Sequence, residues 1–165
     1  MKNILTAFLL FFSVVLLAQE HGDIPDSYLV NLHGHRIKTS EIHNHGKPFI
    51  ISFWASWQKS SLLELNNIHE AYKLWHHETG VKVFAISIDF PETYDDVHKY
   101  ALHHKWEFDI LIDEHSHFEK EMKTSGIPHT ILFDGDGKIV WQRHSYSSGD
   151  EEELHDALIK LKNSK

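Results

Sequence analysis

Apolar runs and helix-spaced apolar positions alternate along this chain, and together they predict its central secondary structure. Phe49 to Trp54 and Val81 to Asp89 are nearly continuous apolar runs, preceded by proline and glycine respectively, which is typical of buried strands. Between them, apolar residues recur at helical spacing from Leu62 to Trp75, and Gly80 supplies a helix stop. The pattern at the centre of the chain is therefore strand, helix, strand.

Shorter segments complete the predicted order on either side of this centre. Gly34 separates two short strand candidates, and Asp134-Gly135-Asp136-Gly137 is a strong hairpin turn. The remaining predicted elements are strands at 28–32, 36–38, 108–111, 130–133 and 138–143, a short helix or turn at 39–42, and helices from 91 to about 104, at 113–124 and at 150–162. We predict an α/β fold in which helices flank one central mixed sheet, with an extra N-terminal β-hairpin.

The first residues have the pattern of a secretory signal peptide. Lys2 precedes an apolar run from Ile4 to Leu17, and Ala18 is a small residue at a plausible cleavage point. The run is short for a membrane span, which needs about 20 apolar residues, so an uncleaved anchor is the less favoured alternative. We predict a signal peptide at 1–18, a single domain at 19–165, and export to the periplasm or the extracellular space.

Composition excludes several classes of function. The chain has no cysteine, so it can form no disulfide despite its predicted export. Its formal net charge of −8 argues against binding to nucleic acid or to an anionic membrane surface. Its 16 histidines mean that mild acid would change its charge strongly.

One segment gives the sequence its strongest resemblance to a known family. Phe53-Trp54-Ala55-Ser56-Trp57-Gln58-Lys59-Ser60-Ser61 is similar to the F-W-A-x-W-C-x-x-C signature of thioredoxin-like disulfide reductases. Gly126-Ile127-Pro128-His129-Thr130 resembles their cis-proline loop, which is usually G-x-P-T-T, and residues 134–140 resemble their last hairpin. In this order the motifs resemble the TlpA/ResA-like branch of the thioredoxin superfamily, which implies a thioredoxin-like fold and a thiol–disulfide oxidoreductase ancestry.

The chain departs from that family at the residues that carry out its disulfide chemistry. Gln58 and Ser61 stand at the two cysteine positions, whereas disulfide exchange needs an attacking thiolate and a resolving thiol. Asn66 replaces a family proline, and Glu64 stands where the branch has a buried glutamate that assists proton transfer. From the residues alone, Glu64 reads more simply as the partner of Ser61 in a capping box at the start of the helix.

The resemblance therefore implies a redox-inactive relative that binds a partner. The expected contact residues are Trp57, beside the degenerate Gln58-Lys59-Ser60-Ser61 turn, and Ile127 with a cis Pro128, whose backbone could pair with an extended peptide. The expected partner is a peptide or protein of the cell envelope. An alternative is the family's oxidoreductase role, assisted by a partner that supplies the thiols.

No cofactor is expected, and two further chemistries remain open at this stage. His33, His35, His43 and His45 could converge at one end of the sheet and bind a transition metal, if only weakly, because neutral imidazole is a common ligand. A serine enzyme would need Ser60 or Ser61 within hydrogen-bond reach of His129. Solvent-exposed histidines and an architectural role for His129 are the simpler interpretations.

Overall fold

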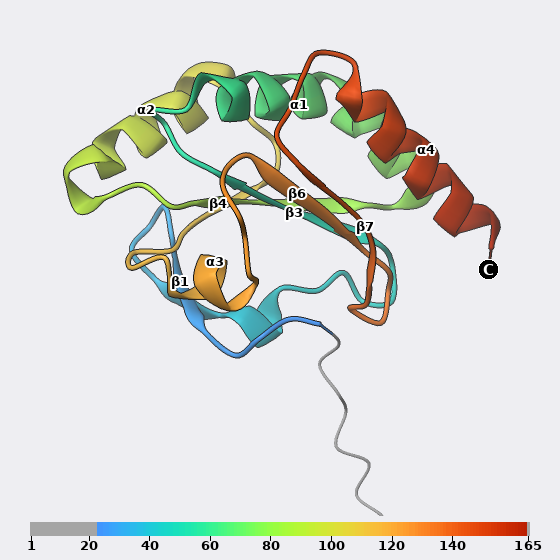
Figure 1. Ribbon diagram of the computed structural model, residues 1–165, viewed down its shortest axis with the longest axis horizontal. Coiled ribbons are helices and arrows are strands. Elements are labelled where there is room, and N and C mark those ends of the chain that lie inside the picture. Colours follow the sequence, from blue (N-terminus) through green and yellow to red (C-terminus); the bar gives the residue numbers. More distant parts are fainter. Residues whose placement is uncertain (1–22, 165) are drawn as a thin grey trace, which may run out of the picture.

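The strands form one mixed sheet, as the sequence predicted. The computed structural model describes residues 23–164, so the predicted signal peptide lies outside the described residues. The sheet runs in the order β2-β1-β5-β4-β3-β6-β7 (Figure 1). Its strands are β1 (Tyr28–Asn31), β2 (Arg36–Lys38), β3 (Phe49–Trp54), β4 (Lys82–Ser87), β5 (Asp109–Ile112), β6 (His129–Phe133) and β7 (Ile139–His144).

The helices cover both faces of this sheet. Figure 1 shows α1, α2 and α4 together on one face and the short α3 on the other. They are α1 (Lys59–Thr79), α2 (Tyr94–His104), α3 (His117–Glu121) and α4 (Asp150–Asn163), with short 3-10 turns η1 (Thr39–Glu41) and η2 (Pro91–Thr93). Within residues 23–164, no helix combines the length and the apolar character needed to cross a membrane.

Alternation along β3 and β6 divides the core into two apolar clusters. Ile50 and Trp54 of β3 pack with Leu65 of α1 on the first face. Phe49 and Phe53 pack with Phe118 of α3 on the second. All six residues of β3 and all five of β6 are buried, because both strands are covered on both faces.

The predicted N-terminal hairpin is present and extends the sheet beyond β5. β1 pairs antiparallel with both β2 and β5. Gly34 takes a φ of 78° in the hairpin turn, a conformation that glycine adopts without steric cost. The carboxamide oxygen of Asn31 accepts hydrogen bonds from the amides of His33 and His35 and closes the turn.

Two predicted helix boundaries are wrong. α1 begins at Lys59, with Gln58 as its N-cap and no side-chain cap, so Ser61 and Glu64 do not form the predicted capping box. The helix predicted at 113–124 is only α3. Asp113 stays outside it, because its carboxylate accepts hydrogen bonds from the amides of His117 and Glu119 and so starts the helix later.

Candidate functional site

The degenerate motif lies in the loop between β3 and α1, and a buried carboxylate fixes that loop. Asp89, which follows β4 and is 1% exposed, accepts a 2.8 Å hydrogen bond from the Ser56 amide and another from the Ser56 hydroxyl. The hydroxyls of Ser87 and Thr93 also donate to it, each at 2.8 Å. The two bonds from Ser56 hold the loop just before Trp57, and those from Ser87 and Thr93 hold the carboxylate in place. From the sequence, Asp89 was predicted only as the last residue of a strand.

The side chains at the two cysteine positions offer no thiol chemistry. Gln58 is the N-cap of α1 and is partly exposed. Ser61 is fully buried in the first turn of α1, and its hydroxyl has no hydrogen-bond partner within the described residues. Because the chain contains no cysteine, the site has neither an attacking thiolate nor a resolving thiol.

Glu64 is buried behind the motif rather than placed at a helix cap. It is 4% exposed, and it accepts hydrogen bonds from the hydroxyl of Thr130 at 2.8 Å and from that of Ser52 at 3.3 Å. Burial raises the pKa of the Glu64 carboxyl to about 7, and the two hydroxyls only partly oppose that rise. The residue therefore occupies the buried position that the family resemblance implied, without a thiol pair to serve.

Asn66, at the family's proline position, also has a structural partner. Its side-chain oxygen accepts a 3.0 Å hydrogen bond from the indole N–H of Trp106. Trp106 is buried and packs edge-on against Trp54 at a ring-centroid distance of 5.2 Å. The substitution thus links the middle of α1 to the segment that precedes β5.

The cis-proline loop lies at the same end of the sheet as the motif. The Ile127–Pro128 peptide bond is cis, as the resemblance implied. β3 and β6 are antiparallel with Phe53 opposite His129, so the residue before β6 lies beside the last residue of β3. Within residues 23–164, the backbone N–H and C=O of Ile127 form no hydrogen bond. The Ile127 side chain packs on the second core cluster.

The Ser–His pair that a serine enzyme would need is not formed by the residues that the structure describes. Thr130 faces α1 through its bond to Glu64, so His129, one residue earlier on the strand, faces the opposite side of the sheet. His129 is 1% exposed, and its ring stacks near Phe53 of the second cluster. Neither Ser60 nor Ser61 is among its hydrogen-bond partners, which are Thr124 and Gln142.

A groove lies beside Trp57, and the residues of α2 that line it were not expected from the sequence. Trp57 is 53% exposed, in agreement with the sequence analysis, and Leu102 of α2 is 78% exposed. The groove between them has a volume of about 680 Å³ and is lined by Ser56, Trp57, Thr93, Asp96, Lys99, Tyr100, Leu102 and His103. An open cleft with large apolar side chains suits an apolar side chain of a partner.

The four candidate metal-binding histidines do not form one site. His43 and His45 lie close, with ring centroids 4.4 Å apart, whereas His33 and His35 are 6.3 Å apart in the hairpin turn. Among residues 23–164, no three histidine, aspartate or glutamate side chains come together as a metal site would require. The four imidazoles that could have converged on one metal therefore do not come together in residues 23–164.

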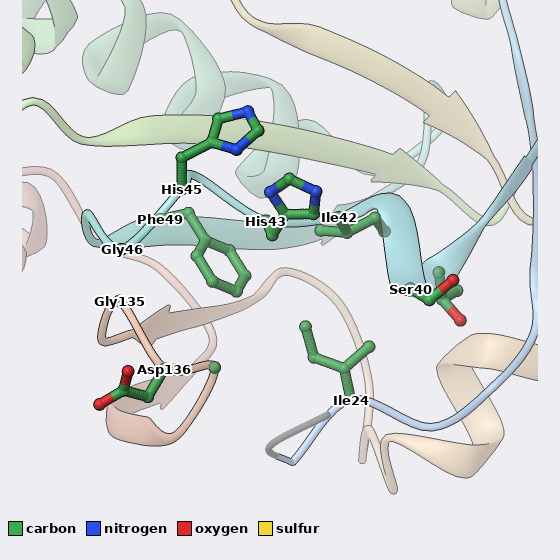
Figure 2. A pocket seen from close by; sticks show the side chains of 11 residues that line it. Ile24, Ser40, Ile42, His43, His45, Gly46, Phe49, Gly135 and Asp136 are labelled. Atoms are coloured by element: carbon green, nitrogen blue, oxygen red, sulfur yellow. The ribbon is translucent and has the colours of Figure 1, made fainter. Parts of the chain in front are cut away.

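His43 and His45 line a separate pocket at the opposite end of the sheet from the motif. The pocket has a volume of about 490 Å³, and Ile24, Ile42 and Phe49 form its apolar part. Figure 2 shows both imidazoles on the segment that leads into Phe49, and Asp136 across the pocket in the β6–β7 turn. The turn and the segment meet backbone to backbone, since a side chain at Gly135 would collide with the carbonyl oxygen of Gly46.

Comparisons with known proteins agree with this fold. The AhpC/TSA family matches residues 21–142. The thiol-disulfide oxidoreductase ResA of Geobacillus kaustophilus is 28% identical over 115 residues, which cover 70% of this chain and 63% of that protein. ResA of Bacillus thuringiensis subsp. konkukian is 25% identical over 139 residues, which cover 84% of this chain and 76% of that protein. The match to the first relative thus spans less than two thirds of its length.

Solved structures show the same architecture. A solution structure of a thioredoxin-like protein from Porphyromonas gingivalis is 37% identical with a TM-score of 0.77, covering 86% of this chain and 93% of that one. A putative thiol:disulfide interchange protein DsbE from Chlorobium tepidum, 24% identical, matches in fold with a TM-score of 0.69 over 85% of this chain and 95% of its own. The chain therefore belongs to the AhpC/TSA family of thioredoxin-like proteins, with relatives among the ResA-type thiol–disulfide oxidoreductases, and it has no cysteine of its own.

Proposed function

We propose that this protein is an exported, redox-inactive binding module that captures an extended peptide segment of a cell-envelope partner. The observation that carries the proposal is the backbone of Ile127, which is unpaired within residues 23–164 and lies at the same end of the sheet as the exposed Trp57. A partner strand would pair with that backbone by β-augmentation. One of its apolar side chains would enter the groove between Trp57 and Leu102. Export is supported by the apolar run and small residue of the predicted signal peptide.

The proposed contact surface, formed by Trp57 and the backbone of Ile127, is suited to binding because it is held in place before a partner arrives. Asp89 fixes the loop that carries Trp57, and Glu64 joins α1 to the strand that follows the cis-proline. A preformed surface loses little conformational entropy on binding. Loss of the thiols removes the reaction and leaves this surface intact.

Peptide capture can be tested with the mature chain and a fluorescein-labelled insulin B chain whose thiols are carboxymethylated. Fluorescence anisotropy should detect saturable binding, and Trp57→Ala should weaken it about tenfold, in the range of an interface anchor residue. Leu74→Ala is the matched control, because Leu74 is 55% exposed on α1 but lines neither the groove nor the motif. An unchanged affinity in Trp57→Ala would remove Trp57 from the contact surface.

The proposed lack of redox activity has its own test. In an insulin-reduction assay, the natural chain should show no activity, and Gln58→Cys/Ser61→Cys should gain it because the rest of the scaffold is present. Reduction by the natural chain, after rigorous removal of contaminating reductases, would contradict the proposal.

A further inference from the structure

Two histidines stack against each other directly beside the cis-proline. His129 of β6 and His144 of β7 are register partners across the ladder. Their ring centroids are 3.8 Å apart and their planes differ by 25°. His129 is buried, whereas His144 is exposed. The family pattern usually has threonine at the first of these positions, so His129 departs from that pattern.

Both rings hold the segment that leads into the cis-proline. His129 Nδ1 lies 3.1 Å from the hydroxyl of Thr124, and His144 Nδ1 lies 3.1 Å from the hydroxyl of Ser125. Next to the pair, the Ser145 amide donates a 2.9 Å hydrogen bond to the carbonyl of Pro128. These two imidazoles and one backbone bond attach segment 124–128 to the sheet. The Ile127 side chain on the second cluster, and the Thr124 amide that donates to the Glu119 carbonyl of α3, also hold it.

The hydrogen bonds of His129 indicate which ring nitrogen carries the proton when the imidazole is neutral. Its Nε2 lies 3.2 Å from the side-chain oxygen of Gln142, which can only accept, so Nε2 carries the proton. Nδ1 is then free to accept from the hydroxyl of Thr124. The neutral ring is satisfied at both nitrogens.

A positive charge on His129 would meet no neighbouring anion, although the Thr124 hydroxyl could turn to accept the second proton. The side chains that face it are Phe53 from β3, Thr124 from the preceding segment, and Gln142 and His144 from β7. None of them is an anion. Burial, and to a smaller extent the neighbouring His144, lower the pKa of His129 to about 4.

The geometry points to an acid-sensitive latch: the neutral His129–His144 pair holds segment 124–128 and its cis-proline against the sheet, and proton uptake releases them. Release exposes His129 to water and lets the two side chains turn away from each other on their paired strands, since the rings would repel each other as cations. This would regulate the peptide-binding surface, a consequence that rests on the function proposed above. The latch itself is a property of the free protein.

The difference between the pKa of His129 in the latched and the released state sets how strongly pH changes the equilibrium of release. A ring that titrates near 4 when latched and at the ordinary 6.5 when released takes up its proton preferentially in the released state. The equilibrium constant for release should therefore rise about 30-fold between pH 7.5 and pH 5. Most of this rise occurs below pH 6.5, because above that value both states are neutral.

Amide hydrogen exchange of the free, mature protein tests the latch without any partner. The Ser145 amide reports release, because its acceptor is the Pro128 carbonyl. After correction for intrinsic exchange, its protection should fall about 30-fold from pH 7.5 to pH 5 in the natural chain. In His129→Thr it should change less than threefold, whereas the control His33→Thr, in the exposed hairpin turn, should behave like the natural chain.

A second variant keeps the test decisive if His129→Thr does not fold. His144→Thr leaves His129 buried but removes the repulsion, so the fall in protection should be smaller than in the natural chain yet still present. Protection independent of pH in the natural chain, or an equal fall in a folded His129→Thr, would overturn the latch. Loss of peptide binding in Trp57→Ala tests the proposed function alone, so the two ideas can fail separately.

Discussion

Glu64 on α1 accepts a 2.8 Å hydrogen bond from the hydroxyl of Thr130, the second residue after the cis-proline. The contact joins the helix that follows the degenerate motif to the strand that follows the cis-proline loop. It also keeps an ionisable group in the apolar interior, where its charged form is poorly solvated. In a chain without thiols, the measurable effect of this carboxyl is on stability.

Replacement of Glu64 by glutamine should stabilise the protein above pH 7. The pKa of the carboxyl is raised from 4.5 to about 7 in the folded state. Between these values the folded state retains a proton that the unfolded state has lost, so stability falls as pH rises. Glu64→Gln, which mimics the protonated form, should raise the free energy of unfolding by up to about 3 kcal/mol above pH 7 and by nearly nothing below pH 4.5.

Urea denaturation at pH 4.5, 6 and 8 measures this difference. Glu70→Gln is the matched control, because Glu70 lies on the exposed side of the same helix. A difference between Glu64→Gln and the natural chain that does not grow with pH would show that the carboxyl is not protonated in the fold.

His129 should oppose Glu64 over nearly the same pH range. The pKa of His129 is lowered from 6.5 to about 4, so stability falls as pH drops through that window, because only the unfolded state readily takes up the proton. The two contributions should largely cancel between pH 4.5 and 6.5. Glu64→Gln alone should then lose about 2 to 3 kcal/mol on acidification across this window, and His129→Thr alone should gain a similar amount.

The double variant Glu64→Gln/His129→Thr provides the check by denaturant unfolding. Its stability should again vary little between pH 4.5 and 6.5, since both opposing groups are gone. A strong acid loss that persists in the double variant would place the titrating group elsewhere.

The sequence predicted the sheet well because its strands carry local signals. The bounds of β3 match the apolar run from Phe49 to Trp54, and Gly80 ends α1 in the left-handed conformation. The N-cap of α1 was predicted three residues too late, at Ser61 instead of Gln58, because the sequence pattern fits a capping-box Glu64 as well as it fits a buried one. The partners that decide between them, Ser52 and Thr130, are 12 and 66 residues away from Glu64.

The candidate site was only partly predictable for the same reason. Trp57 and the cis-proline followed from motifs, whereas the groove depends on how α2 lies against the Trp57 loop. The face of His129 could have been inferred, since strand alternation puts it opposite Thr130. The contact between His129 and His144 depends on hairpin register, which the strand pattern alone left open.

His43 and His45 should give the protein only weak metal affinity. Two imidazoles 4.4 Å apart can share a Cu²⁺ or Zn²⁺ ion, but a structural zinc site uses four protein ligands. Isothermal titration should show one weak event per chain that disappears in His43→Ala/His45→Ala. The control His33→Ala/His35→Ala, whose rings are farther apart, should leave it unchanged. Persistence of the event in the first variant would place the metal at other histidines.

The Asn66–Trp106 hydrogen bond should be worth more than a surface contact. Asn66→Ala would leave the buried indole N–H of Trp106 without its acceptor, at a cost of about 1 to 3 kcal/mol in the free energy of unfolding.

Trp106→Phe removes the donor but also part of a packed ring, so its own cost mixes packing with hydrogen bonding. In the Trp106→Phe background, Asn66→Ala should cost less than in the natural chain, because no indole N–H remains to be stranded. Denaturant unfolding of the four proteins gives the coupling energy, which should be about 1 kcal/mol. A coupling near zero would mean that water replaces Asn66 at no cost, and that loss of the family's proline at this position was structurally neutral.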